Sequence, residues 1–180
     1  YTDVSLIDII ANTASPLSYG ISHQPFENQL SMKEAIQISK STIIKFVQNG
    51  IILDINDIEK RIENEKNYSS SLSTKVDNKI QLNPLYSLWF IKYDDDKLHI
   101  YLYLNAVTGD VLRLVVTEEL ENSQQNLNIK SQEEILNLYL EYLKLEDLKT
   151  DLSVYNELYA RCRLKDTNIC LDTSYMFDKK

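Results

Sequence analysis

The side chains of this sequence that could do chemistry are two histidines, two cysteines and several runs of carboxylates. A metal site needs His, Cys or carboxylate ligands that converge at usable spacing, and neither His23 nor His99 has such ligands nearby in the sequence. The run Asp94-Asp95-Asp96 lacks the glycine and the distal glutamate of an EF-hand loop, so it predicts a solvated turn between strands. No Gly-x-Ser-x-Gly motif marks a nucleophilic serine. We therefore expect no catalytic residues, no metal and no cofactor, in a protein that is not an enzyme.

Cys162 and Cys170 flank a predicted turn that begins at Lys165. Outside the reducing cytosol, an isolated pair of cysteines is naturally used as a disulfide. A turn over residues 165–167 would set Cys162 opposite Cys170 and allow the bond. A turn over 165–168 would instead set Leu171 opposite Cys162 and preserve one apolar face of the hairpin. The sequence leaves both registers, and hence the disulfide, open.

Composition limits the classes of partner. The 180-residue chain carries 27 acidic and 19 basic residues, which gives a formal net charge of −8, and its lysines and arginines are scattered singly. This balance repels phosphate backbones, so we expect no nucleic-acid partner. No run approaches the roughly 20 apolar residues that cross a bilayer. Because the sequence starts at Tyr1 without methionine, we expect a membrane to be reached only through a removed N-terminal anchor.

The strongest helical signal begins at Ser31. Ser31 and Glu34 have the spacing of a capping box, in which each side chain bonds the other residue's backbone N–H. Apolar residues then recur every three to four positions, and Asn49-Gly50 supplies a stop. These signals predict a helix at 32–48.

The segments on either side of this helix give weaker signals. Residues 1–30 read as an N-terminal arm with one short helix at 3–11. A second short helix should begin near Asn56, with acidic residues in its first turn and basic residues further on. The polar stretch 69–78 reads as a linker.

From Tyr86 onward the apolar period changes to two, which indicates strands. Strands are predicted over 88–93, 98–105 and 111–116, and they should form an antiparallel meander. One face of the second strand carries Leu and Ile and should pack on the helix at 32–48, because an isolated meander is marginal without a covering layer.

The same order of elements recurs in the second half. Ser131 and Glu134 repeat the capping-box spacing, and alternation from Val154 to Leu164, followed by a final strand from Ile169, predicts a hairpin. The predicted fold class is therefore α+β, with each helix laid on an antiparallel sheet and two tandem units. After the arm, the first unit spans 31–120, and 121–180 forms a smaller helix-plus-hairpin unit packed on the first.

A row of aromatic side chains is the most interesting predicted surface. It comprises His99, Tyr101 and Tyr103 on one strand, with Tyr155 and Tyr159 in the second half. Tyrosine supplies contact area with a hydrogen-bonding tip and is enriched where proteins bind each other. The alternative is that this face packs on the N-terminal arm or is buried between the two halves, because cross-strand aromatic pairs also stabilise sheets.

A predicted tight turn joins the second and third strands of the meander, at Asn105, Ala106, Thr108 and Gly109. Glycine is suited to this place because it accepts a positive φ at little cost. The letters around the turn, with Ser31-Met32-Lys33-Glu34-Ala35 and the Trp89 strand, resemble a PepSY-type domain over residues 30–116. That family writes its hairpin as an acidic residue, Ala, any residue, Thr and Gly, whereas the acidic position here is Asn105.

The resemblance implies a bacterial module outside the cytoplasm, secreted or anchored on the outer face of the membrane, that acts by binding. Such modules occur in protease propeptides, in membrane-associated regulators of sensor kinases and in spore-germination proteins. We therefore expect a non-catalytic module that regulates or restrains a protein partner. The alternatives are a small-molecule-binding protein with a pocket in a cone-shaped α+β fold, and a structural surface or spore protein.

Overall fold

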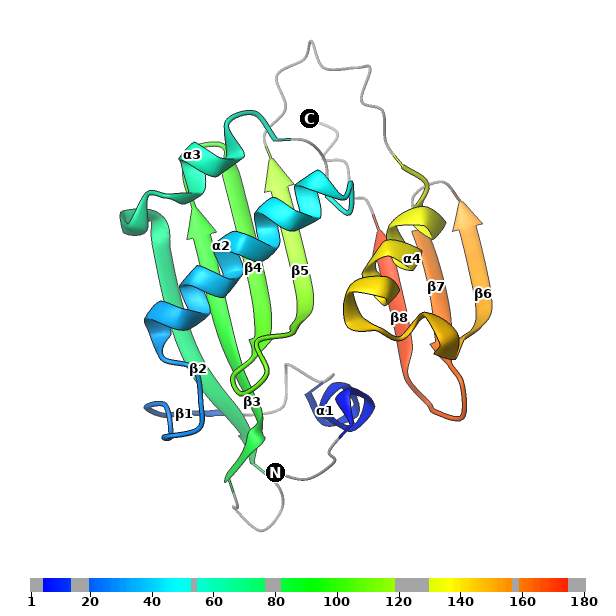
Figure 1. The fold of residues 1–180 in the computed structure, drawn as a ribbon, viewed down its shortest axis with the longest axis horizontal. Helices are drawn as coiled ribbons and strands as arrows, with labels where there is room; N and C mark the ends of the chain where they lie inside the picture. The colour runs from blue at the N-terminus through cyan, green and yellow to red at the C-terminus, as the bar shows by residue number, and fades with distance from the viewer. Residues whose placement is uncertain are drawn as a thin grey trace. The chain divides into compact units, whose positions relative to one another are not determined.

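The computed structural model describes residues 5–13, 20–52, 55–76, 82–118, 130–156 and 159–174. It has the predicted α+β class, with helices and two antiparallel sheets (Figure 1). The chain forms two compact units: Tyr1–Ile44 with Asn56–Glu121, and Lys45–Ile55 with Asn122–Lys180. Residues 45–55 thus belong to the second unit. The predicted division of the chain at one point, between residues 120 and 121, does not assign them there.

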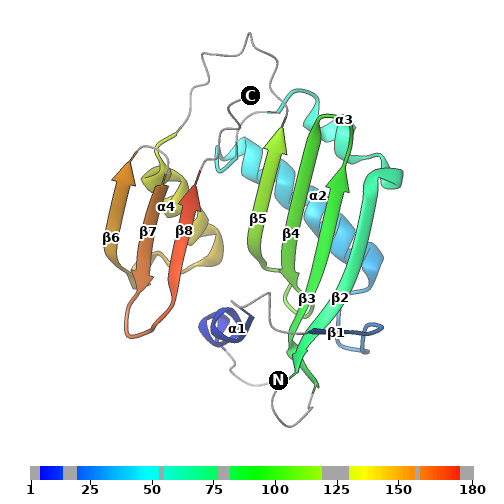
Figure 2. The same ribbon diagram turned by 180° about the vertical axis from the view of Figure 1, so that it is seen from behind.

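The first unit is built on a five-stranded sheet in the order β1-β2-β3-β4-β5. Its strands are β1 (Gly20–Ser22), β2 (Tyr68–Val76), β3 (Leu82–Asp94), β4 (Leu98–Asn105) and β5 (Val111–Glu118). Helix α2 (Met32–Gln48) crosses one face of this sheet, and the view from behind shows the opposite face (Figures 1 and 2). The unit also contains α1 (Leu6–Thr13), α3 (Ile58–Ile62) and a 3-10 turn, η1 (Glu65–Asn67).

Helix α2 confirms the prediction for 32–48 at both ends. The Ser31 hydroxyl accepts from the Glu34 backbone N–H at 3.3 Å, and the Glu34 carboxylate accepts from the Ser31 N–H at 2.8 Å, which is a capping box. The Ser31 hydroxyl also donates to the Glu34 carboxylate at 2.7 Å, and this bond, followed by the one from the Ser31 N–H, holds the pKa of Glu34 below its ordinary value. After the helix, Gly50 has a φ of +70° and ends it as a left-handed residue should.

The core of the first unit lies on the helix-facing side of β3 and β4. The inward side chains of β4 (Leu98, Ile100, Leu102 and Leu104) are all fully buried, and they alternate with half-exposed residues as the sequence predicts. Alternate residues of a strand point to opposite faces, so β4 has one buried face and one that is partly open to solvent.

The meander is larger than predicted, because the stretch read as a linker at 69–78 is largely strand β2. β2 pairs with β3 from Tyr68↔Tyr93 to Val76↔Leu82. The linker prediction was wrong because the serines on the outward side of β2 make its sequence look uniformly polar. The inward residues Leu72 and Thr74 are nevertheless buried. Strand β3 also begins at Leu82 and not at the predicted Leu88.

The second unit pairs helix α4 with a three-stranded sheet in the order β6-β7-β8. Ser131 and Glu134 form the predicted capping box at the start of α4 (Gln132–Leu143). Its strands are β6 (Lys149–Asn156), β7 (Tyr159–Leu164) and β8 (Cys170–Ser174). A 3-10 turn, η2 (Glu146–Leu148), precedes β6.

The predicted hairpin in this unit was therefore one strand short. Residues read as one strand from Val154 to Leu164 belong to two antiparallel strands, which pair from Lys149↔Leu164 to Asn156↔Tyr159. Period-two alternation did not reveal this reversal, because the bulge between Val154 and Asn156 sets Val154 opposite Ala160 and so keeps even-numbered residues of both strands on one face.

Candidate functional site

The face of the first sheet that points away from α2 carries a continuous stack of aromatic and cationic side chains. Register places Tyr101 opposite Lys92 and Tyr103 opposite Phe90 on β3, and it places Arg113 of β5 opposite Tyr103. Side chains on directly paired or diagonal positions of adjacent strands lie close enough to touch. We call these five residues the aromatic stack.

The rings of the aromatic stack contact one another and are flanked by cations. The Tyr101 and Phe90 rings are stacked, with centroids 6.2 Å apart and an interplanar angle of 5°. Phe90 and Tyr103 lie 4.9 Å apart and tilted. The Lys92 ammonium lies 5.7 Å from the centroid of the Tyr101 ring and the Arg113 guanidinium lies 5.7 Å from that of Tyr103, distances at which cation–π attraction operates.

His99 lies on the same face beyond Tyr101, where its Nδ1 contacts a carboxylate oxygen of Asp94. The other Asp94 oxygen lies 2.6 Å from the Lys92 ammonium. Hydrogen bonds from Lys92 and then from His99 hold the pKa of Asp94 below its ordinary value, and the bond to Asp94 raises the pKa of Lys92. A carboxylate that orients an imidazole is one part of many acid–base sites, but the structure gives His99 no hydrogen bond to a hydroxyl or thiol of any described residue.

The predicted surface residues divide between the two units. His99, Tyr101 and Tyr103 share the face of β4 as predicted, and all three are half-buried. Tyr159 is a half-buried residue of β7 in the second unit. The Tyr155 side chain lies outside the described residues.

Sequence reasoning missed Phe90, Lys92 and Arg113 as members of this surface. Phe90 and Lys92 alternate with the buried Trp89 and Ile91, so their outward direction could have been read from the period-two pattern. Their pairing with tyrosines could not, because it depends on the exact length of the turn between β3 and β4.

The turn between β4 and β5 is held by the buried amide of Asn105. The Asn105 Oδ1 accepts from the backbone N–H groups of Val107 and Thr108, both at 2.9 Å, and its Nδ2 donates to the Leu85 carbonyl at 2.7 Å. Gly109 adopts a φ of +77°, which confirms the conformational reason for a glycine at this position. The predicted turn residues therefore shape the hairpin.

The same turn is anchored to the start of α2. The Leu30 N–H donates to the carbonyl of Ala106, which is fully buried, at 2.7 Å, and the Trp89 indole donates to the Leu30 carbonyl at 2.9 Å. A Cβ on Gly109 would lie 3.1 Å from the Ile38 Cδ1, so the helix leaves little room at that point. At the outer side of the turn, the exposed Thr108 hydroxyl donates to Asp110.

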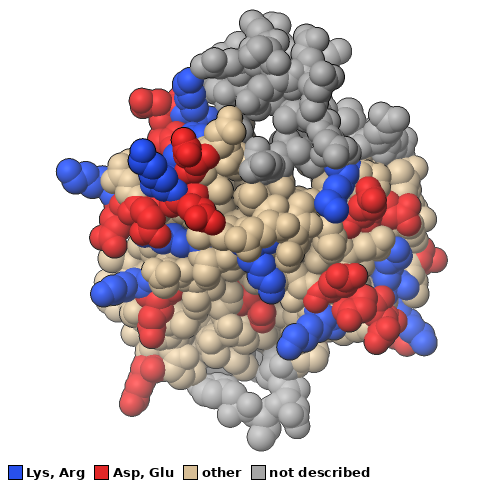
Figure 3. All heavy atoms as spheres, turned by 45° about the horizontal axis from the view of Figure 1, so that its top comes forward, with Lys and Arg blue, Asp and Glu red and all other residues tan. Residues whose placement is uncertain are grey.

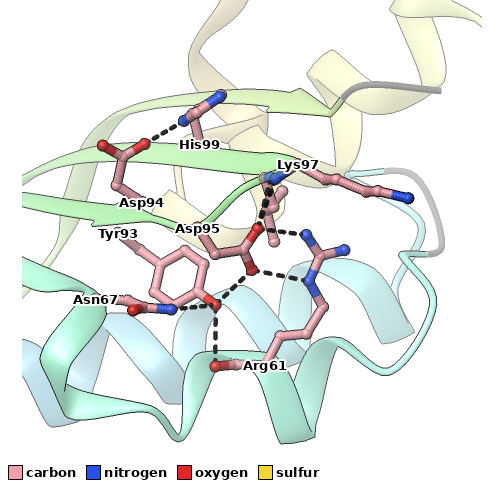
Figure 4. Close-up of polar contacts among 8 residues, drawn as sticks. Arg61, Asn67, Tyr93, Asp94, Asp95, Lys97 and His99 are labelled. Atoms are coloured by element: carbon pink, nitrogen blue, oxygen red, sulfur yellow. Dashed lines mark hydrogen bonds and ion pairs between the residues drawn. The ribbon is translucent and has the colours of Figure 1, made fainter.

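A second polar cluster surrounds Asp95 (Figure 4). Asp95 accepts two hydrogen bonds from the Arg61 guanidinium, at 2.8 and 3.0 Å, and one from the Tyr93 hydroxyl at 2.7 Å. It also accepts from the backbone N–H groups of Lys97 and Leu98. Figure 4 shows these groups turned toward one another, with Asp94 and His99 facing each other apart from them.

The prediction of a solvated turn at 94–96 was thus wrong for Asp95, whose side chain is only 20% exposed. Arg61 is the main cause that holds the pKa of Asp95 far below its usual range. The hydrogen bonds of Arg61 join α3 to the β3–β4 hairpin, and Asn67 of η1 donates to the Tyr93 hydroxyl at 3.3 Å, whereas the other bonds to Asp95 lie within the hairpin. We therefore interpret the cluster as structural.

His23 makes packing and hydrogen-bonding contacts within the first unit. Its ring stacks on Phe26, with centroids 4.8 Å apart, and its Nε2 contacts the Thr74 hydroxyl. Thr74 in turn contacts the Ser87 hydroxyl. Both hydroxyl residues are fully buried, so a substrate cannot reach them in this conformation.

The cysteines adopt the register that does not join them. Cys162 lies opposite Leu171, Cys170 lies opposite Arg163, and both thiols are free. Residues one step apart in register point to opposite faces of a sheet, which is why a bond between these two thiols is geometrically excluded here. Burial is the main cause that raises the pKa of Cys162, and the thiol itself is fully buried.

These positions predict how the two thiols react. In the native protein, iodoacetamide should modify Cys170 well before Cys162, because Cys162 is buried and its raised pKa leaves less thiolate. Mass spectrometry of unreduced, denatured protein should then show two alkylated cysteines. A mass with no alkylation under those conditions would show that the disulfide register is the true one.

Other kinds of site find little support in the described part of the chain. No three His, Cys, Asp or Glu side chains among those residues are placed to hold a metal ion, and no helix within the described ranges is both long and apolar enough to cross a membrane. A pocket in the second unit, lined by Lys45, Asn49, Ile51, Leu138, Glu141 and Tyr142, measures about 190 Å³, below the roughly 300–1,000 Å³ of ordinary ligand sites.

Comparison with known proteins identifies no relative. No protein-family model matches the chain, no curated protein matches it, and no solved structure matches its fold.

Proposed function

We propose that this chain is a non-catalytic protein-binding module whose partner docks on the aromatic stack. The observation that carries the proposal is the half-exposed row of Phe90, Tyr101 and Tyr103, held between Lys92 and Arg113 on a five-stranded sheet. Tyrosine, phenylalanine and arginine are all enriched in protein interfaces, and tyrosine and arginine are also enriched among the residues that contribute most of the binding energy. The sheet presents them without the entropy cost of ordering a loop.

The resemblance to PepSY-type domains supports the same proposal and extends it. It favours an extracytoplasmic module that regulates or restrains a protease, a sensor kinase or a germination component. The second unit repeats the order of a capped helix followed by antiparallel strands, which is consistent with two tandem PepSY-like or cystatin-like units. The small pocket of the second unit gives no comparable support to a small-molecule-binding protein.

The proposal is tested by affinity capture with the full chain and three variants. Tyr101→Ala combined with Tyr103→Ala should abolish capture of the partner, because it removes two of the three stacked rings. Tyr101→Phe combined with Tyr103→Phe preserves the stack and should retain most of the capture. Tyr159→Ala is the matched control, a half-buried tyrosine on a strand of the other unit.

Circular dichroism and thermal melting of each variant separate a lost surface from a lost fold. Capture that survives in the folded double alanine variant at the level of the wild type would remove the aromatic stack as the docking surface.

A further inference from the structure

The faces of the tyrosine rings in the aromatic stack are already occupied. Tyr101 is engaged by Phe90 and by the Lys92 ammonium, and Tyr103 is engaged by Phe90 and by the Arg113 guanidinium. A flat ligand such as a nucleic-acid base binds by stacking on a ring face, and here it would compete with these neighbouring side chains. What the rings offer to a partner is their edges, which carry the positive side of the aromatic quadrupole, and their hydroxyls.

The charged groups on this face are mostly cationic. Lys92 and Arg113 are the cations of this face, and its one described carboxylate is Asp94, which the Lys92 ammonium and the His99 ring both contact. The other described side chains that register brings to the face from β2 and β5 are Ser69, Ser71, Ser73, Val115 and Thr117, none of which carries charge. Elsewhere the surface is different: over the face drawn in Figure 3, cationic side chains lie among acidic ones, and the whole chain has a net charge of −8.

We propose that the segment docked on the aromatic stack is an acidic stretch of the partner protein. This proposal rests on the proposed function above. Carboxylates of the segment pair with Arg113 at one end of the stack and, in competition with Asp94, with Lys92 at the other. Because the rest of the chain repels acidic partners, the local cations also confine such a segment to this face.

The probe for this proposal is a fluorescein-labelled peptide of about ten residues, which spans about 33 Å when extended, in which glutamate alternates with leucine. A second peptide carries glutamine at every glutamate position, and a single-stranded DNA oligomer provides a polyanion without carboxylates. Fluorescence anisotropy with the full chain measures all three at about 10 mM and about 150 mM ionic strength, where the Debye length is about 30 Å and about 8 Å.

We expect the glutamate peptide to bind about tenfold more tightly than the glutamine peptide at the lower ionic strength. This difference in affinity should narrow at the higher ionic strength, because exposed ion pairs are weak and salt screens them. Arg113→Gln and Lys92→Gln should each weaken binding of the glutamate peptide about threefold. Arg163→Gln is the matched control: it removes the same charge from an exposed position on β7 and should leave binding unchanged.

Equal binding of the glutamate and glutamine peptides would overturn the proposal, as would tighter binding of the DNA oligomer than of the glutamate peptide. So would a loss of glutamate-peptide affinity in Arg163→Gln equal to that in Arg113→Gln. Affinity capture distinguishes this failure from failure of the proposed function. A partner that is captured through Tyr101 and Tyr103 but is insensitive to Arg113→Gln would leave the docking surface in place and refute only its acidic chemistry.

Discussion

Replacing Asn105 with alanine should lower the free energy of unfolding of the first unit by about 3 kcal/mol. The substitution leaves the Val107 and Thr108 N–H groups and the Leu85 carbonyl without the partners that Asn105 provides. Asn105 itself is fully buried, so water cannot simply replace its amide. Urea unfolding followed by the fluorescence of Trp89, the one tryptophan of the chain, measures the loss in the unit that contains the turn.

Two further substitutions sharpen this expectation. Thr108→Ala removes an exposed hydroxyl of the same turn and should cost less than about 1 kcal/mol. Asn105→Asp introduces the acidic residue of the PepSY-type motif, but places a carboxylate oxygen where Nδ2 now donates to the Leu85 carbonyl. It should therefore destabilise the unit, and an unchanged midpoint for either Asn105 variant would show that the amide does not hold the turn.

Replacing Asp95 with alanine should cost about 2 to 3 kcal/mol, the second large effect. The carboxylate accepts from Arg61 twice, from the Tyr93 hydroxyl and from two backbone N–H groups. Its removal leaves the Arg61 guanidinium, which is 21% exposed, without this carboxylate. Asp96→Ala is the control, since the structure gives this exposed neighbour no hydrogen bond to a described residue, and it should leave unfolding within about 0.5 kcal/mol of the wild type.

The contribution of Asp95 should also depend on pH in a defined direction. Its folded pKa is depressed chiefly by Arg61, so the folded state favours the ionised carboxylate more than the unfolded chain does. The stabilisation is fully present above the unfolded pKa of about 3.9 and is lost as the pH falls below it. The wild type should therefore exceed Asp95→Asn in stability at about pH 7, and the gap should narrow below about pH 4. A gap that stays constant with pH would mean that ionisation of Asp95 contributes nothing.

Local signals in the sequence were sufficient to predict the two capped helices. Each helix start is predicted by a serine and a glutamate three positions apart, Ser31 with Glu34 and Ser131 with Glu134. The structure forms both capping boxes. Strand β4 and the turn that follows it could be predicted equally well, because apolar alternation and a turn glycine are both signals within a short stretch of sequence. Strand β2 was missed because what identifies it is pairing with β3, and its own outward residues are serines.

The candidate sites depended more on contacts between distant residues. Arg61 and Asp95 are 34 positions apart, and nothing in either neighbourhood predicts their pairing. The aromatic stack was half predicted: Tyr101 and Tyr103 follow from alternation within β4, whereas Phe90 and Arg113 join them only through the register of two hairpins. A bulge between Tyr103 and Leu104 contributes to the second register, and bulges are not visible in a period-two pattern.

The most direct test of the central claim is photo-crosslinking from the aromatic stack itself. Benzoylphenylalanine is placed at position 103 in one protein and at position 159, in β7, in another, and each is irradiated in the presence of its native cellular proteins. We expect one dominant crosslinked protein from position 103, suppressed by excess wild-type chain but not by the Tyr101→Ala and Tyr103→Ala double variant. Equal crosslinking from position 159, or none from position 103, would contradict it.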